Sequence, residues 1–154
     1  MMLSAQTHGG CREAERTGTA MTTRFLTPFE RLGGREPLHR IIDDFYTRID
    51  ADADLRAIFP ADLVPGREKQ KLFLEQWLGG EPLYEREHGP PMMRRRHLPF
   101  AITVPAAERW LVHFGAALEA AGTDAALAAE IMTALRPVAM RMVNTQEVEG
   151  PASG

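Results

Sequence analysis

Apolar side chains recur at three- and four-residue steps between residues 38 and 49, the spacing that places them on one face of an α-helix. These side chains are Leu38, Ile41, Ile42, Phe45, Tyr46 and Ile49. The same period predicts further helices over residues 65–78, 105–121 and 124–142. Because no stretch of useful length alternates apolar and polar residues, the sequence predicts an all-α fold without a sheet.

Shorter elements are marked by capping residues and glycine pairs. Thr27, Pro28 and Glu30 have the pattern of a capping box with proline at the first helical position. The glycine pair at 33–34 should end that helix almost at once. A short apolar turn is expected over residues 55–59.

Residues 81–96 contain several helix breakers, which predict a long loop with at most a short helix leading to His97. The breakers in and just before this stretch are Gly80, Pro82, Gly89, Pro90 and Pro91. The glycine pair at 79–80 should also terminate the predicted helix over 65–78.

The composition predicts one soluble globular domain with a substantial core, because 44% of the 154 residues are hydrophobic and 25% are charged. A net charge of −3 gives no drive toward nucleic acid or an anionic membrane, and no apolar stretch approaches the roughly 18 residues of a membrane span. Charged residues at 12–16 replace the apolar core of a secretory signal, which predicts a cytoplasmic protein. The lone Cys11 excludes an internal disulfide and a cysteine-based zinc site. We expect a disordered N-terminal extension over 1–24, a single domain over 25–145 and a flexible tail over 146–154.

His97 follows an arginine cluster at 94–96 and precedes the apolar run Leu98-Pro99-Phe100. A neutral imidazole beside cations, facing an apolar pocket, suits ligation of a cofactor that is apolar in the middle and carboxylated at its edge. Haem is such a cofactor. A surface or loop-anchoring role is the alternative for His97. The histidines form no pair at i,i+4 spacing and have no acidic third ligand, so a zinc site is not predicted.

Two polar side chains interrupt apolar helix faces. Tyr46 adjoins Phe45, and Gln70 lies one turn before Phe73. An amide buried without a hydrogen-bond partner costs about 1–3 kcal/mol, so Gln70 requires either a partner or a place at the boundary of the face. Two interpretations of Gln70 follow. In the first its amide bonds a backbone group; in the second it converges with Tyr46 and the Trp110 indole N–H on a buried, anion-like ligand such as bound O2.

The chain carries a set of short motifs in order between residues 27 and 145. They are Phe29-Glu30-Arg31-Leu32-Gly33-Gly34, Phe45-Tyr46, Leu72-Phe73-Leu74-Glu75-Gln76 with Gly79-Gly80, Arg94-x-Arg96-His97-x-Pro99-Phe100, Trp110-Leu111 and Met142-Val143-Asn144. In their order and spacing they resemble a group II truncated haemoglobin, of which the glycine pairs and a tryptophan 13 residues after the histidine are traits. The resemblance implies a two-over-two globin fold, with antiparallel helix pairs around one haem b.

The resemblance also implies roles for individual residues around the iron. His97 matches the proximal histidine that ligates the iron, so it is both a metal ligand and a cofactor contact. Tyr46 and Trp110 match the distal tyrosine and tryptophan, and Gln70 falls at a distal position that holds leucine or glutamine in the family. Gly66 matches a position that is small in this group and opens a side path for ligands.

Further residues match the surroundings of the haem. Phe59 falls where the family packs an aromatic ring on the haem. Arg94 and Arg96 match basic residues near the propionates, where Tyr84 joins them. The cofactor-binding set that the resemblance implies is His97, Phe59, Phe73, Met93, Arg94, Arg96, Tyr84 and Trp110.

Two function classes follow from the implied site. The first is a protein that binds O2, and also NO or CO, through polar distal donors and serves oxygen transport or storage. The alternative is a haem-dependent redox enzyme, an NO dioxygenase or a peroxidase-like protein, which would need a separate reductase as electron donor. A helical interaction domain without cofactor leaves Gln70 and the arginine-flanked His97 unexplained. The sequence leaves a homodimer open.

Overall fold

The computed structural model of the protein describes residues 25–146. Within this range the chain forms helices and no strand, so the predicted all-α class is confirmed. The helices are α2 (Pro28–Arg31), α3 (Arg35–Ala51), α4 (Ala53–Arg56), α5 (Val64–Trp77), α6 (Leu83–His88), α7 (Met93–His97), α8 (Val104–Ala120) and α9 (Ala125–Arg141). The predicted N-terminal extension and, apart from Gln146, the predicted C-terminal tail lie outside the described residues.

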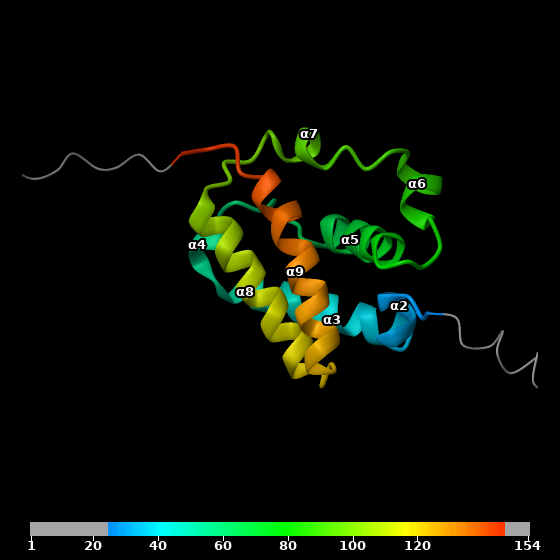
Figure 1. The fold of residues 1–154 in the computed structure, drawn as a ribbon. Coiled ribbons are helices and arrows are strands. Elements are labelled where there is room, and N and C mark those ends of the chain that lie inside the picture. The colour runs from blue at the N-terminus through cyan, green and yellow to red at the C-terminus, as the bar shows by residue number, and fades with distance from the viewer. Residues whose placement is uncertain (1–24, 147–154) are drawn as a thin grey trace, which may run out of the picture.

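The core is built from the four long helices α3, α5, α8 and α9. The pairs that pack most extensively are α8 with α9, α3 with α8, and α3 with α5. Figure 1 shows α8 and α9 side by side across α3, while the stretch that contains α7 passes over the opposite side of the fold. The predicted apolar stripe of α3 is fully buried in this core together with side chains from α5, α8 and α9.

The caps that begin these helices follow from the sequence. The Thr27 hydroxyl accepts from Glu30 N (3.2 Å) and the Glu30 carboxylate accepts from Thr27 N (3.0 Å), so the predicted capping box is confirmed. Thr103 caps α8 by accepting from Ala106 N at 3.2 Å. Asp124 caps α9 in the same way. The helices predicted over 65–78, 105–121 and 124–142 begin and end within one residue of those bounds, and α3 begins three residues before Leu38, the first residue of its apolar stripe.

The glycine pair at 79–80 packs α2 against the end of α5. Gly79 has φ +98°, and a Cβ there would lie 2.7 Å from Thr27 Cβ. A Cβ on Gly80 would lie 2.8 Å from Glu75 O. Phe29 N donates to Leu78 O at 3.0 Å across the same contact. The pair ends α5, as predicted, and it also removes side chains where two helix ends meet.

The predicted long loop over 81–96 is wrong in part, because it contains α6 as well as the short helix that leads to His97. The breakers bound α6 and leave its interior free of them: Pro82 precedes it and Gly89, with φ +72°, follows it. The helix packs on α5 through the Phe73 and Tyr84 rings, whose centroids are 5.8 Å apart. Tertiary packing therefore stabilises a helix that is too short to form alone.

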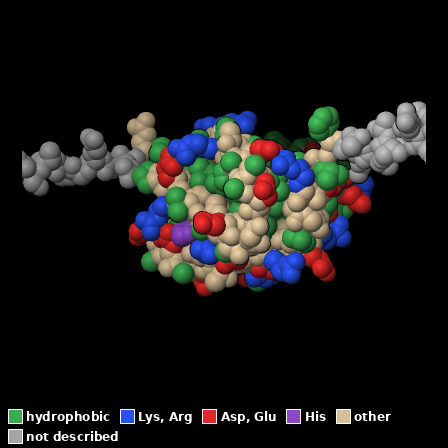
Figure 2. All heavy atoms as spheres, turned by 60° about the horizontal axis from the view of Figure 1, so that its bottom comes forward, with side chains coloured by type: hydrophobic (Ala, Val, Ile, Leu, Met, Phe, Trp, Pro, Cys, Tyr) green, Lys and Arg blue, Asp and Glu red, His purple; other side chains and the backbone are tan. Residues whose placement is uncertain are grey.

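The surface of the described residues is mixed in charge. On the face shown in Figure 2, lysine and arginine side chains are interspersed with aspartate and glutamate side chains. None of the helices described over residues 25–146 is long and apolar enough to cross a membrane.

Candidate haem-binding site

His97 is the last residue of α7, and its ring is fixed by the turn that precedes it. His97 Nδ1 lies 2.6 Å from Met93 O. A carbonyl oxygen only accepts, so Nδ1 carries the proton and donates, and the lone pair is left on Nε2. No hydrogen bond or ion pair occupies Nε2 within the described residues. This tautomer is the one in which an imidazole can ligate a metal through Nε2.

The helix that carries His97 is weakly supported by the protein alone. It has five residues, none of them buried, and it lacks a side-chain N-cap. Met92 precedes it in the left-handed region at φ +42°, which is uncommon for a residue with a side chain. A set of large apolar side chains on α5, on α7 and in neighbouring segments is likewise only half-buried: Phe59, Phe73, Met93, Phe100, Ile102 and Met140. Apolar surface that the protein itself does not bury, beside a free imidazole nitrogen, fits a flat, apolar prosthetic group.

The three arginines of α7 have no carboxylate partner in the part of the chain that the structure describes. Arg94 Nη1 reaches only the carbonyl of Arg141, at 3.5 Å, and Arg96 Nη2 donates to the carbonyl of His88 at 3.1 Å. Most other arginines among the described residues are ion-paired, as Arg31 is with Glu130 at 2.6 Å. An anion-free guanidinium cluster beside an apolar surface fits a cofactor with carboxylates at its edge.

Tyr84 connects this cluster to α5. Its ring is buried, meets Phe73 edge-on at 82°, and lies 5.1 Å from the His88 ring. The Arg96 guanidinium carbon lies 5.7 Å from the Tyr84 ring centroid, within the range of a cation–π contact. The structure thus brings together Tyr84, Phe73 and Arg96, three residues of the predicted cofactor-binding set.

Tyr46 and Gln70 bond each other, an arrangement that the sequence does not reveal. The Tyr46 hydroxyl donates to Gln70 Oε1 at 2.8 Å. Tyr46 is 5% exposed, and burial raises the pKa of its phenol above the ordinary value, opposed by the nearby Arg67 charge. The phenol therefore stays protonated and donates to the amide oxygen of Gln70. The Gln70 amide N–H groups have no partner among the described residues.

Gly66 and Phe59 lie around the same phenol. A Cβ on Gly66 would lie 3.7 Å from the Tyr46 hydroxyl, which is ordinary van der Waals contact. The Phe59 and Tyr46 ring centroids are 6.2 Å apart. Gly66, Gln70 and Phe73 follow at four- and three-residue steps along α5, so one face of this helix carries all three.

Trp110 reaches this group through Phe45. Its indole stacks on Phe114, with ring centroids 5.6 Å apart and 6° between the planes, and it meets Phe45 edge-on at 5.0 Å. The Trp110 N–H has no hydrogen-bond partner within residues 25–146. Phe45 also meets the Tyr46 ring, at 5.5 Å, so Phe45 packs between the indole of Trp110 and the phenol of Tyr46.

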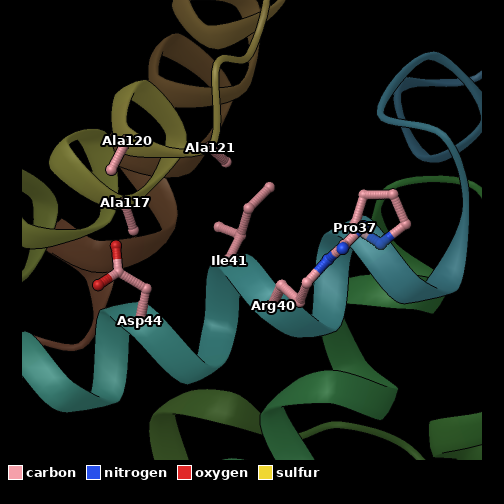
Figure 3. A pocket seen from close by; sticks show the side chains of 7 residues that line it. All are labelled: Pro37, Arg40, Ile41, Asp44, Ala117, Ala120 and Ala121. Carbon is pink, nitrogen blue, oxygen red and sulfur yellow. The ribbon is translucent and has the colours of Figure 1, made fainter.

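Two hollows on the surface of the described residues lie away from the predicted site. In one of about 500 Å³, Ile41 of α3 points toward Ala117 and Ala121 near the end of α8 (Figure 3). In another of about 490 Å³, Asp52 and Arg109 are ion-paired at 2.8 Å. No residue of the predicted cofactor-binding or distal sets lines either hollow.

Sequence reasoning missed some contacts around His97. Asn144, three residues beyond α9, donates to the carbonyl of His97 at 3.1 Å. The carbonyls of His88 and Arg141, which hold two of the arginines, are backbone groups that no side-chain pattern predicts. The only signal for Asn144 was its place in the last of the short motifs.

Comparison with known proteins agrees with the fold and with the motifs. The profile of the bacterial-like globin family matches residues 27–144. The chain is 41% identical over 133 residues to group 2 truncated hemoglobin YjbI of Bacillus subtilis, which covers 86% of this chain and 100% of that protein.

Solved structures give the same result. The group II truncated hemoglobin from Bacillus anthracis matches with a TM-score of 0.79 at 41% identity, over 83% of this chain and 98% of that chain. The truncated oxygen-avid haemoglobin from Bacillus subtilis matches with a TM-score of 0.73 at 42% identity, over 77% of this chain and 100% of that chain. The chain therefore belongs to the bacterial-like globin family, as a group II truncated haemoglobin. The sequence-based resemblance is confirmed, and membership implies a haem cofactor and the binding of small gas ligands.

Proposed function

We propose that this protein binds O2 at haem b, with His97 on one side of the cofactor and Tyr46, Gln70 and Trp110 on the other. The observation that carries the proposal is the 2.8 Å bond from the Tyr46 hydroxyl to Gln70 Oε1. It gives the Gln70 amide a fixed orientation and leaves its N–H groups available as donors. The similar truncated haemoglobin from Bacillus subtilis is oxygen-avid, which supports the same function.

The cofactor would be held by residues on both sides. Haem b supplies the iron to which a diatomic gas attaches. His97 would bind that iron through Nε2, because Nδ1 already donates to Met93 O. Arg94 and Arg96, which have no carboxylate partners among residues 25–146, would pair with the propionates. The sequence has a single cysteine and hence no cysteine pair for covalent haem attachment, which favours haem b.

On the distal side, the donors would distinguish O2 from CO. Bound O2 is far more polarised than bound CO and accepts hydrogen bonds more strongly. Gln70 would donate an amide N–H to the bound O2, and Trp110 would donate its indole N–H. Tyr46 would orient the Gln70 amide through the hydrogen bond that its hydroxyl donates to Gln70 Oε1. Gly66 would leave the approach to Tyr46 open, because it places no side chain near the phenol.

The test is the dissociation of O2 and of CO from the reduced protein, compared with Gln70→Leu. Loss of one hydrogen bond worth about 1.4 kcal/mol should accelerate O2 dissociation about tenfold, and CO dissociation should change much less. Gln76→Leu is the matched control. It removes an amide from the same helix, but that amide accepts from Glu85 N and belongs to neither predicted set of site residues. Equal changes for the two gases, or an O2 rate within about twofold of the parent, would refute the proposed role of Gln70.

The alternative redox function has its own outcome in the same apparatus. A protein that binds O2 for transport or storage should keep its oxygenated spectrum for many turnovers of gas exchange. Mixing with NO would remove that spectrum in either case, because the oxygenated haem of any globin oxidises NO to nitrate and becomes ferric. Only a redox enzyme would restore it through repeated cycles with an added electron donor. Sustained turnover with such a donor would assign the enzyme function in place of the binding function.

A further inference from the structure

Asn144 uses every hydrogen-bonding position of its side chain. Its Nδ2 donates to the carbonyls of His97 (3.1 Å) and Phe100 (2.8 Å). Its Oδ1 accepts from Ile102 N (3.0 Å) and from the Thr145 hydroxyl (2.8 Å). An amide has two donor hydrogens and two acceptor lone pairs, so the side chain is fully satisfied. This pattern also fixes which end of the amide is nitrogen, because two carbonyls require donors.

The backbone around Asn144 strengthens the same contact. Asn144 N and Thr145 N both donate to Ile102 O, at 3.0 and 3.1 Å. The segment after α9 therefore runs beside the segment between α7 and α8, as Figure 1 shows for the red end of the described chain. Arg94, through its 3.5 Å contact with the carbonyl of Arg141, adds a link between α7 and the end of α9.

These contacts converge on the residue with the free imidazole nitrogen. The His97 ring is fixed by Met93 O, and the His97 backbone is fixed by Asn144 and by Phe100 N, which donates to His97 O at 3.0 Å. Helix α7 has only five residues and no side-chain cap, so it cannot define the direction of His97 alone. The backbone that carries the His97 ring is therefore held in part by a bond from a residue 47 positions further along the chain.

We infer that Asn144 is a positioning residue for His97, and that it aims Nε2 at the haem iron by latching the α7–α8 segment to the end of α9. The inference rests on the proposed role of His97 as the iron ligand. Asn144 acts through the backbone of its partners and touches neither the iron nor the gas. Outer partners of metal ligands commonly change metal affinity by about 10–100-fold, so the effect should be measurable.

The test compares the haem-loaded parent with Asn144→Asp and Asn144→Leu. In Asn144→Asp a carboxylate oxygen faces the carbonyls of His97 and Phe100, so both donor bonds become repulsive contacts. We expect the iron–histidine stretching band in the resonance Raman spectrum to shift or broaden, and haem transfer to an acceptor globin to accelerate about tenfold in both variants. Thr145→Val is the matched control: it removes one bond to Oδ1 and keeps the bonds to His97 and Phe100, so it should stay within about twofold of the parent.

Each further outcome decides between the two claims. An unchanged band and an unchanged haem-transfer rate in Asn144→Asp would overturn the inference and leave the role of His97 intact. Loss of the iron–histidine stretching band in His97→Gly would support His97 as the iron ligand. Persistence of that band in His97→Gly would refute the proposed function itself.

A measurement without Asn144 variants covers the case in which they do not fold. If the Asn144 contacts favour ligation of the iron by His97, then ligation by His97 must stabilise the Asn144 contacts by the same free energy. In haem-loaded His97→Gly with added imidazole, the ligand is no longer joined to the chain. The Ile102 amide, which donates to Asn144 Oδ1, should then exchange its hydrogen about tenfold faster than in the parent. Exchange within twofold of the parent would overturn the inference.

Discussion

Replacing Tyr46 by phenylalanine removes one oxygen atom and, with it, the 2.8 Å bond that the phenol donates to Gln70 Oε1. The ring contacts should survive, because Phe45 and Phe59 meet the Tyr46 ring at centroid distances of 5.5 and 6.2 Å and do not involve the hydroxyl. Tyr46→Phe therefore isolates the orientation of the Gln70 amide from the packing of the pocket.

The expected cost to stability is small. A neutral hydrogen bond contributes about 1 kcal/mol net, and the amide of Gln70 is only half-buried, so solvent can compensate part of the loss. For a domain of this size about 1 kcal/mol corresponds to a melting temperature lower by roughly 4 °C. The cost to O2 binding should be larger, because the amide loses its fixed direction. A loss of about 1.4 kcal/mol in the bound state corresponds to a tenfold faster O2 dissociation.

The assay is stopped-flow replacement of O2 by CO, and of CO by NO, on the reduced parent, Tyr46→Phe, Gln70→Leu and the double variant. If Tyr46 acts through the amide, the double variant should release O2 about as fast as Gln70→Leu alone. An O2 dissociation rate in Tyr46→Phe within about twofold of the parent would refute the reasoning. Effects of the two substitutions that multiply would show that Tyr46 and Gln70 act independently.

Three further predictions concern other parts of the molecule. Replacing Arg94 and Arg96 together by glutamine should speed haem transfer to an acceptor globin, most clearly at low salt, because each partly exposed charge contact contributes about 1 kcal/mol; an altered O2 release at unchanged haem transfer would contradict this. Gly66→Val should slow O2 and CO association alike in flash photolysis, since the added side chain starts 3.7 Å from the distal phenol; unchanged association rates would exclude this path. The Arg109 guanidinium, and then His113, hold the pKa of Asp52 well below its ordinary value, so the ionised carboxylate stabilises the fold above the unfolded-state pKa of about 4 and that contribution is lost as pH falls toward the folded-state pKa. The difference in melting temperature between parent and Asp52→Asn should therefore shrink as the pH falls below about 4, and a difference that grows in acid would contradict the assignment.

The long helices were predictable because their signals are local. The apolar stripe of α3 depends on steps of three and four residues, and the caps at Thr27, Thr103 and Asp124 are bonds to the third residue on. Such patterns are complete within one or two turns of chain. The structure reproduces them because the core favours the same faces that the sequence marks.

Helix α6 was not predictable from the same kind of signal. Its six residues lie between Pro82 and Gly89 and are too few to show a period. The contacts that stabilise it come from α5, through the Tyr84 ring on Phe73 and through Glu85 N, which donates to Gln76 Oε1 at 3.1 Å. A breaker-rich segment can therefore hold a helix when a neighbouring helix supplies its partners.

The candidate site was predictable residue by residue, but its connections were not. Tyr46 and Gln70 each stand out as polar groups on apolar faces, yet their mutual bond joins residues 24 apart. The bond from Asn144 to His97 spans 47 positions. Only the folded chain brings these groups together, so sequence patterns could name candidate donors and a candidate ligand but could not say which residue orients which.

The most direct test of the account is the absorption spectrum and haem content of the purified protein beside those of His97→Ala. Since His97 Nδ1 is committed to Met93 O and Nε2 is free, we expect one haem per chain in the parent, with a reduced spectrum that shows a histidine-ligated iron. His97→Ala should retain little haem or show altered iron coordination. An unchanged spectrum with unchanged haem content in His97→Ala would contradict the assignment of His97 and, with it, the proposed site.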